Sequence, residues 1–150
     1  MLNATSLKEF TKKFQTSEKN VVREYCQHLF LSYLYEQPES DKICFKGGTA
    51  LRIVLQSPRF SEDLDFTILY ITKHQIETCF INVLERFHQA AISAELEEAK
   101  ETTGGYLGRA RFIVLDIPVT IQIELSKRPG KAIHGDSDVI QNVYIPPYTL

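Results

Sequence analysis

The sequence predicts an α+β fold: a small, mixed, twisted β-sheet with helices packed mainly on one of its faces. Residues 17–36 and 72–87 carry apolar side chains at helical spacing, whereas residues 106–125 alternate between apolar and polar side chains as paired strands do. The chain has 150 residues, of which 43% are hydrophobic and 24% are charged. It is therefore expected to bury one core, in a single domain that spans residues 1–150.

Helices dominate the first half of this prediction. Residues 5–14 form a short helical pattern, and Ser17 can cap a longer helix that runs to about residue 36. A further long helix is expected after Thr72, which forms a capping box with Gln75 and precedes three turns of apolar repeat. In the earlier long helix, the apolar positions recur at i, i+3, i+4 and i+7 and indicate a face packed on the core: Val22, Tyr25, Cys26, Leu29, Phe30, Tyr33 and Leu34.

Strands dominate the second half. Residues 91–97 are predicted to form a strand, residues 98–103 a polar connector, and residues 106–115 a long strand entered through two glycines. The tripeptide Asp116-Ile117-Pro118 is interpreted as a tight hairpin. Residues 119–125 then alternate between apolar and polar side chains without a fault, which predicts a strand with one buried face.

One stretch of the first half combines several signals of a ligand site. A short buried strand at residues 43–45 leads into Lys46-Gly47-Gly48, after which a helix is expected from Thr49 to about residue 55. The two glycines allow the backbone to turn tightly and to approach a bulky ligand, because no Cβ is in the way. The helix would direct its first free N–H groups and the positive end of its dipole over that turn, where an anion is stabilised.

Two carboxylates follow this helix at a spacing of two residues. Alternation over residues 64–68 predicts a strand on which Asp63 and Asp65 share one face while the apolar residues face the core. The two Cα atoms would then lie roughly 6–7 Å apart. Such a pair repels itself unless a cation lies between, and oxygen ligands suit Mg²⁺ or Mn²⁺. Strand, glycine turn, helix and acidic strand occur in the order that a metal-assisted phosphoryl transfer site requires.

The combined stretch resembles the signature of the DNA polymerase β nucleotidyltransferase superfamily, in which Gly-Gly or Gly-Ser is followed by Asp-x-Asp. The residues FKGGTAL at 45–51 and RFSEDLDF at 59–66 resemble in particular the AbiEii/AbiGii family of abortive-infection toxins. The likeness is specific over residues 44–68 and looser beyond them. It implies that the α+β fold is a polymerase β-like nucleotidyltransferase core.

The resemblance also implies roles for particular residues. A third acid on a later strand would join Asp63 and Asp65, and Glu124, on the polar face of residues 119–125, is the candidate. These three acids would be catalytic and would hold Mg²⁺ or Mn²⁺. Nucleotide binding would fall to the glycine turn and its neighbours: Lys46, Gly47, Gly48, Thr49, Arg59 and Ser61. Other basic residues could neutralise triphosphate charge but are interpreted mostly as ordinary surface charges: Arg52, Arg109, Arg111, Lys127 and Arg128.

The function implied by the resemblance is transfer of a nucleoside monophosphate from a nucleoside triphosphate to an acceptor hydroxyl, with RNA or tRNA as the candidate acceptor. The protein would be the toxin of a bacterial toxin–antitoxin pair, with an antitoxin protein as its partner. Two alternatives stay open: a nucleotide-binding module without chemistry, and a partner-binding remnant whose acids only solubilise a strand. In the family a helical part follows this core, so the chain is expected to lack that part, to expose apolar surface, and to self-associate.

Composition narrows the class of protein further. A net charge of −2 neither indicates nor excludes a nucleic-acid partner. No apolar run approaches the ~18 residues of a membrane span and no signal peptide is present, so a soluble, cytoplasmic protein is expected. The three cysteines are expected to be buried, reduced thiols, and the four histidines to be solvated or structural. Residues 129–138 are polar and loop-like, and an apolar run follows at residues 139–145.

Overall fold

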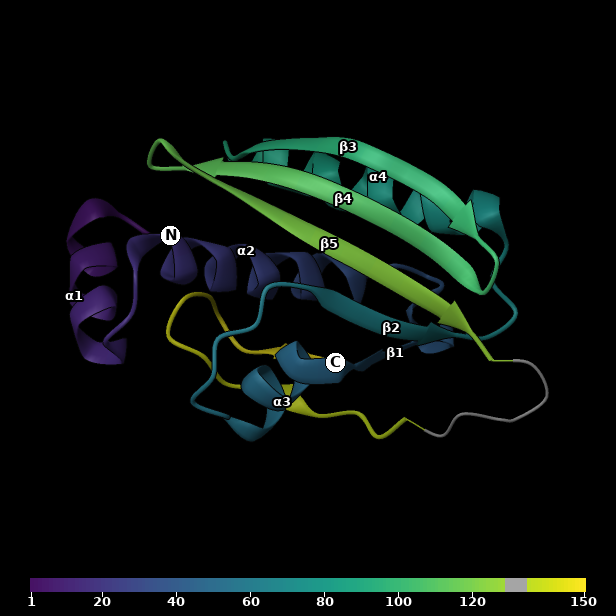
Figure 1. The fold of residues 1–150 in the computed structure, drawn as a ribbon, viewed down its shortest axis with the longest axis horizontal. Helices are drawn as coiled ribbons and strands as arrows, with labels where there is room; N and C mark the ends of the chain where they lie inside the picture. The colour runs from purple at the N-terminus through teal and green to yellow at the C-terminus, as the bar shows by residue number, and fades with distance from the viewer. Residues whose placement is uncertain (129–134) are drawn as a thin grey trace.

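A computed structural model describes residues 1–128 and 135–150, and in these residues helices cover one face of a five-stranded sheet (Figure 1). The predicted α+β class and one-sided packing are confirmed. In chain order the elements are α1 (Ala4–Phe14), α2 (Glu18–Leu34), a 3₁₀ turn (Ser40–Lys42), β1 (Ile43–Lys46), α3 (Gly47–Leu55), β2 (Leu64–Ile68), α4 (Lys73–Gln89), β3 (Ser93–Thr102), β4 (Gly105–Val114), β5 (Ile117–Lys127), β6 (Val139–Ile140) and β7 (Tyr148–Thr149).

Local capping sets where the two long helices begin. Ser17 accepts a hydrogen bond from the backbone N–H of Asn20 at the start of α2, and Thr72 and Gln75 form the predicted capping box at the start of α4. These caps satisfy backbone donors that have no partner within the helix. Both helices therefore lie where the sequence pattern places them.

The sheet is mixed, with strand order β1-β2-β5-β4-β3. Strand β2 is antiparallel to β1 but parallel to β5, while β5, β4 and β3 form an antiparallel meander. In Figure 1, α2 passes behind β5 and α4 behind β3 and β4, whereas α3 lies beside β1 and β2. One face of β4 and β5 is thus covered by helices, and the opposite face is open.

The core lies between the sheet and helices α2 and α4. On β2, Leu64 and Phe66 are fully buried, and on β5 Ile121 and Ile123 are also buried. The residues between them point to the open face, because successive side chains of a strand alternate. The buried face therefore fixes which side chains of β2 and β5 reach solvent.

Two predicted boundaries are wrong. The sequence predicts a polar connector at residues 98–103, but residues 98–102 continue β3 and pair with β4 as far as Gly105. Because β3 is an edge strand, its polar side chains meet solvent and do not mark a break. The hairpin turn is formed by Leu115 and Asp116, both at positive φ, so Ile117 and Pro118 already belong to β5.

The helix after β1 also begins earlier than predicted. It is expected from Thr49, but α3 begins at Gly47, which has φ +84°. The glycine accommodates this left-handed backbone at the point where the strand turns into the helix. Gly47 and Gly48 are therefore the first, exposed residues of α3.

The C-terminal segment returns along α2 and α3. Strands β6 and β7 pair with each other, and the expected loop at residues 129–138 is described only from residue 135 onward. His134 lies outside the described residues.

Cys26 and Cys79 are buried and Cys44 is half-buried, all as free thiols. Across the described part of the chain, no helix is both long and apolar enough to cross a bilayer.

We predict that Phe66→Ala destabilises the fold by about 3–5 kcal/mol, because truncating a fully buried ring loses transfer free energy and leaves a cavity. Phe66 is 0% exposed and its ring centroid lies 5.4 Å from that of Phe45. Urea unfolding measures the loss. The control Ile81→Ala removes a side chain that is 62% exposed and should change stability by within about 0.5 kcal/mol. Equal losses in the two variants would contradict this placement of the core.

Candidate active site

The three predicted acids come together on the open face of the sheet. Asp65 on β2 and Glu124 on β5 are register partners in the parallel pair, so their side chains leave the same face of adjacent strands. Their Cα atoms are separated by about one strand spacing, ~4.8 Å. Asp63 precedes β2 by one residue and is exposed, Asp65 is half-buried, and Glu124 is exposed. The structure therefore brings Glu124 next to two acids that lie 59 and 61 positions earlier in the chain.

The three carboxylates repel one another. Partial burial raises the pKa of Asp65, repulsion from Glu124 and Asp63 adds to the rise, and the charge of Lys46 opposes it. Partial burial likewise raises the pKa of Asp63, with repulsion from Glu62 and Glu124, while Arg23 opposes the rise. Each acid thus contributes to the field at its neighbours. A cation placed among them would relieve this repulsion.

The glycine turn lies directly against the acids. Lys46 pairs with Asp65 across β1 and β2 and is the N-cap residue of α3. A Cβ added to Gly47 would lie 2.5 Å from Oδ2 of Asp65, and one added to Gly48 would lie 3.2 Å from Oγ of Ser61. Any side chain at Gly47 would collide with the carboxylate, which gives this glycine a reason beyond its positive φ. The N-terminus of α3 and the carboxylates therefore border one site.

The other predicted nucleotide-binding residues occupy different positions around this turn. Thr49 is buried, and its hydroxyl donates a hydrogen bond to the backbone carbonyl of Asp63. Its side chain thus holds the acidic segment in place, and its backbone N–H remains part of the helix N-terminus. Ser61 is half-buried beside Gly48, whereas Arg59 is exposed in the segment between α3 and β2.

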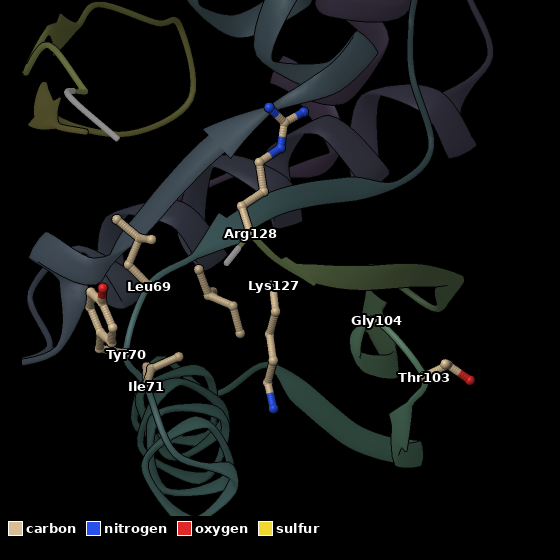
Figure 2. Close-up of a pocket in the computed structure, with 8 residues that line it drawn as sticks. Leu69, Tyr70, Ile71, Thr103, Gly104, Lys127 and Arg128 are labelled. Carbon is tan, nitrogen blue, oxygen red and sulfur yellow. The ribbon is translucent and has the colours of Figure 1, made fainter. Parts of the chain in front are cut away.

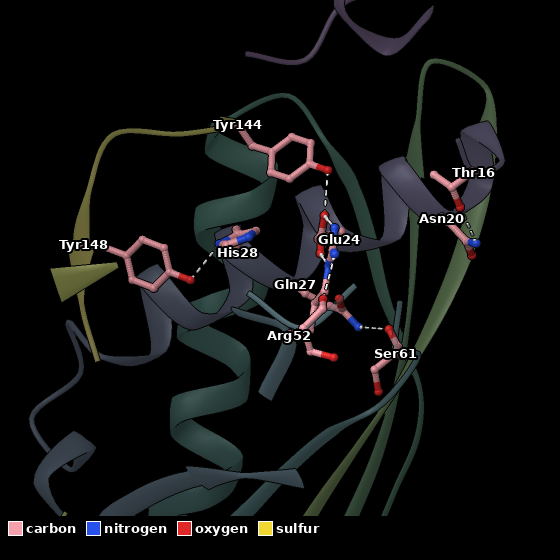
Figure 3. Close-up of polar contacts among 10 residues, drawn as sticks. Thr16, Asn20, Glu24, Gln27, His28, Arg52, Ser61, Tyr144 and Tyr148 are labelled. Carbon is pink, nitrogen blue, oxygen red and sulfur yellow. Dashed lines mark hydrogen bonds and ion pairs between the residues drawn. The ribbon is translucent and has the colours of Figure 1, made fainter. Parts of the chain in front are cut away.

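A buried polar cluster holds the segment that carries Asp63 (Figure 3). The Gln27 side chain on α2 is 1% exposed and donates to the carbonyls of Ser61 and Glu62 at 2.9 and 3.2 Å. Arg52 on α3 donates to the carbonyl of Ser57 at 2.8 Å and pairs with Glu24 at 2.5 Å. Both ends of the segment between α3 and β2 are thereby fixed to helices.

The C-terminal segment completes this cluster. Tyr144 donates its hydroxyl hydrogen to Glu24 at 2.7 Å, and the Tyr148 hydroxyl lies 2.8 Å from Nδ1 of His28. Burial is the main cause that lowers the pKa of His28 to about 4, so this imidazole is neutral at neutral pH. His28 is therefore structural, as the sequence predicts.

Sequence reasoning missed these polar residues of α2. It identified the aromatic face of the helix, but Arg23, Glu24 and Gln27 are buried as well, because α2 contacts the sheet on one side and both α3 and the segment after it on the other. The available signal was a second stripe of polar residues, at 20, 23, 24 and 27, with the same helical spacing as the apolar one. A polar stripe on a helix ordinarily indicates solvent, so the pattern alone did not reveal its burial.

The donor set fits a divalent cation, but the side chains do not form a ready-made cage. Three carboxylates on one face supply the hard oxygen ligands that Mg²⁺ and Mn²⁺ prefer. Among residues 1–128 and 135–150, however, no group of three or more His, Cys, Asp or Glu side chains is positioned to hold a metal ion.

A separate pocket of about 610 Å³ lies at the far end of the parallel pair (Figure 2). Its lining includes Tyr70, Lys127 and Arg128. Lys127 has the same strand parity as Leu125 and Ile123 on β5, so it extends from the opposite face to Glu124. The structure therefore does not bring the predicted basic residue Lys127 to the carboxylates.

Known proteins resemble the chain in sequence and in fold. The profile of the family described as "Nucleotidyl transferase AbiEii toxin, Type IV TA system" matches residues 29–141. The crystal structure of JHP933 from Helicobacter pylori is similar, with a TM-score of 0.52 and 26% identity, over 83% of this chain and 50% of that chain. A second Helicobacter pylori structure, described as a candidate nucleotidyltransferase, has a TM-score of 0.50 and 28% identity, over 75% of this chain and 47% of that one.

The chain thus spans about half the length of these two solved structures. A search of curated protein sequences finds no significant match.

We expect Asp65→Asn to raise the melting temperature at pH 7 in EDTA. The folded-state pKa of Asp65 is raised above its unfolded value, so the ionised carboxylate destabilises the fold, and this cost appears as pH rises through that window. The gain should vanish below about pH 3, where the carboxyl is protonated in both states. Added Mg²⁺ should stabilise the wild type more than the variant.

The matched control is Asp41→Asn, an exposed acid in the 3₁₀ turn, which should show neither effect. A drop of several degrees for Asp65→Asn in EDTA would instead identify Asp65 as a hydrogen-bond anchor.

We expect Gln27→Leu to cost about 1–3 kcal/mol, because it leaves two carbonyls of the Asp63 segment without their donor. Amide hydrogen exchange at residues 59–63 should accelerate, since the segment loses its tie to α2. The control Gln89→Leu changes an exposed glutamine at the end of α4. Unchanged exchange at residues 59–63 in Gln27→Leu would exclude a positioning role for Gln27.

Proposed function

Because the chain belongs to the AbiEii nucleotidyl transferase toxin family, we propose that it transfers a nucleoside monophosphate from a nucleoside triphosphate to an acceptor hydroxyl. The observation that carries the proposal is the register pairing of Asp65 with Glu124, with Asp63 one residue before β2 and close enough to raise the pKa of Asp65 by repulsion. No single acid on a strand face would support it. Three acids beside an exposed helix N-terminus form the constellation that phosphoryl transfer uses.

In this reaction the acceptor oxygen attacks the α-phosphorus of the triphosphate. The bond from that phosphorus to the bridging oxygen of the β-phosphate breaks, pyrophosphate leaves, and the hydroxyl proton is released to solvent. Negative charge develops on the phosphoryl oxygens and on the leaving group. The protein must therefore supply positive charge or N–H donors on both sides of the reacting phosphorus.

Each residue of the site has a place in this scheme. Asp63, Asp65 and Glu124 would hold Mg²⁺ or Mn²⁺, which supplies charge neutralisation and a lower pKa for the attacking hydroxyl. The exposed N–H groups at Gly47 and Gly48, with that of Thr49, would bind the β- and γ-phosphates at the positive end of α3. Lys46, Arg59 and Ser61 would add cationic and hydroxyl contacts: Lys46 and Ser61 from beside the turn, Arg59 from the exposed segment before β2.

The family further supports a role as the toxin of a type IV toxin–antitoxin system, with an antitoxin protein as partner. We propose RNA, including tRNA, as the acceptor.

The exposed apolar side chains Leu51 and Leu55 on α3 line a groove of about 880 Å³, and we propose this groove as the surface for the expected self-association. These assignments concern the whole protein, and the chain covers about half of the solved relatives.

We expect the chain to label RNA when total RNA is incubated with Mg²⁺ and each radiolabelled nucleoside triphosphate in turn. Asp65→Asn and Glu124→Gln should each reduce labelling by about two orders of magnitude or more, because each removes a ligand from the charge-stabilising group. Mass spectrometry of the RNA identifies the added nucleotide.

The matched control is Glu85→Gln, an exposed acid on α4, which should label like the wild type. Nucleotide binding without transfer in the wild type, unchanged by EDTA, would favour the alternative of a binding module that lacks chemistry.

A further inference from the structure

A cationic pocket adjoins the acids on the side away from the glycine turn. It has a volume of about 440 Å³, and four of its lining residues are basic while two are acidic. This local excess of positive charge stands out in a chain whose net charge is −2. The basic residues are Lys19, Arg23, Arg109 and Arg111, and the acidic residues are Glu62 and Asp63.

The pocket forms where β5 has no strand on its β2 side. Strand β2 pairs with β5 only from Ile123 onward, so the earlier part of β5 borders open space next to the start of α2. Arg109 and Arg111 on β4 lie across from Gln122 and Thr120 on β5, in the same row of side chains as Glu124. The basic side chains of β4 therefore lie on the same open sheet face as Glu124, next to the acids.

The acids around the pocket neutralise only part of its positive charge. Arg23 is 8% exposed, its Nε has no hydrogen-bond partner, and its ion pair with the exposed Glu62 is long, at 3.5 Å. Arg109 pairs with Glu98 at 3.4 Å. Within the described residues, neither Lys19 nor Arg111 takes part in an ion pair. A buried guanidinium edge without an acceptor and two free surface cations together favour an anionic ligand.

The chemistry of the lining favours a phosphate backbone over other anions. Arginine binds phosphate in a bidentate manner, and Thr120 and Gln122 add neutral hydrogen-bonding groups. None of the described residues that line the pocket is aromatic, so it offers no surface on which bases could stack. Such a lining contacts phosphates and carries no sequence information.

The position of the pocket indicates which of the two phosphate-bearing substrates, the nucleoside triphosphate or the acceptor, it would bind. The glycine turn at residues 46–49 touches Asp65 from the β1 side, and none of its residues lines the pocket. Asp63 does line the pocket, so the acids lie between the turn and the cations. If the triphosphate occupies the turn, the pocket is left for the second substrate.

We propose that this cationic pocket binds the phosphodiester backbone of a nucleic-acid acceptor, next to its terminal hydroxyl. The assignment of the bound strand as the acceptor rests on the proposed transfer reaction, whereas the binding itself does not. The strand would approach along the open face of β4 and β5, with its end directed to Asp63. The triphosphate would meet it from the opposite side.

The test measures binding alone, in EDTA and without nucleotide, so that it can succeed even if transfer is absent. A fluorescein-labelled single-stranded RNA oligonucleotide is titrated with the full chain by fluorescence anisotropy at several salt concentrations. The double variant Lys19→Gln/Arg111→Gln should bind at least tenfold more weakly and lower the salt slope by about 1.4, the value for two lost phosphate contacts on a single strand. Both side chains are exposed, so the melting temperature should be unchanged.

The matched control is Lys73→Gln/Arg86→Gln, which removes the same two residue types from α4 on the helical face and should bind within twofold of the wild type. A DNA oligonucleotide of the same sequence should compete, and preference for RNA would show that the 2′-hydroxyl contributes. Equal weakening in both double variants would overturn the proposal. Equal competition by polyglutamate would also overturn it, because it would indicate an acidic protein ligand. So would a loss of nucleotide affinity in the Lys19→Gln/Arg111→Gln variant, measured in a separate nucleotide titration, if its RNA binding were retained.

Discussion

The parallel pairing of β2 with β5 is the constraint on which the site depends. It joins a strand near the middle of the chain to one near its end, and its register places Asp65 beside Glu124. The same pairing ends at Ile123, which leaves the start of β5 uncovered and opens the cationic pocket. A slip of one residue would turn every one of these side chains to the other face, so the buried Leu64, Phe66 and Ile123 enforce the register.

Helix α2 both packs on the core and holds part of the candidate active site. Its apolar residues pack on the sheet, while Gln27 and Glu24 are buried against the α3 side, where they hold the segment that carries Asp63. Buried polar groups are costly unless every donor and acceptor is satisfied, and here most are. Among the described residues, Nε of Arg23 and Nδ2 of Asn142 are the buried side-chain atoms without a partner, and Arg23 lies in the lining of the cationic pocket. One of these two unsatisfied donors therefore belongs to a residue of the surface to which we assign a ligand.

Much of the fold follows from local signals. Ser17 and Thr72 cap the long helices, and strict alternation defines β2 and β5. The errors fall where local composition and tertiary environment disagree. Residues 98–102 are polar because β3 is an edge strand, and Gly47 belongs to α3 because its positive φ allows the helix to begin directly after β1. These positions depend on neighbours that a sequence window does not contain.

The candidate site, too, has some features that the local sequence predicts and others that only the tertiary structure decides. Residue order alone predicted that Asp63 and Asp65 lie close together beside a glycine turn, because strand alternation and glycine chemistry act over a few residues. In the structure β2 begins at Leu64, so Asp63 stands one residue before the strand. Glu124 was a candidate only through family resemblance. Its pairing with Asp65, the burial of Gln27, and the grouping of Lys19 with Arg111 were decided by tertiary structure. These contacts join distant segments, and what places them is the burial of the opposite face of the sheet, a property of the whole chain.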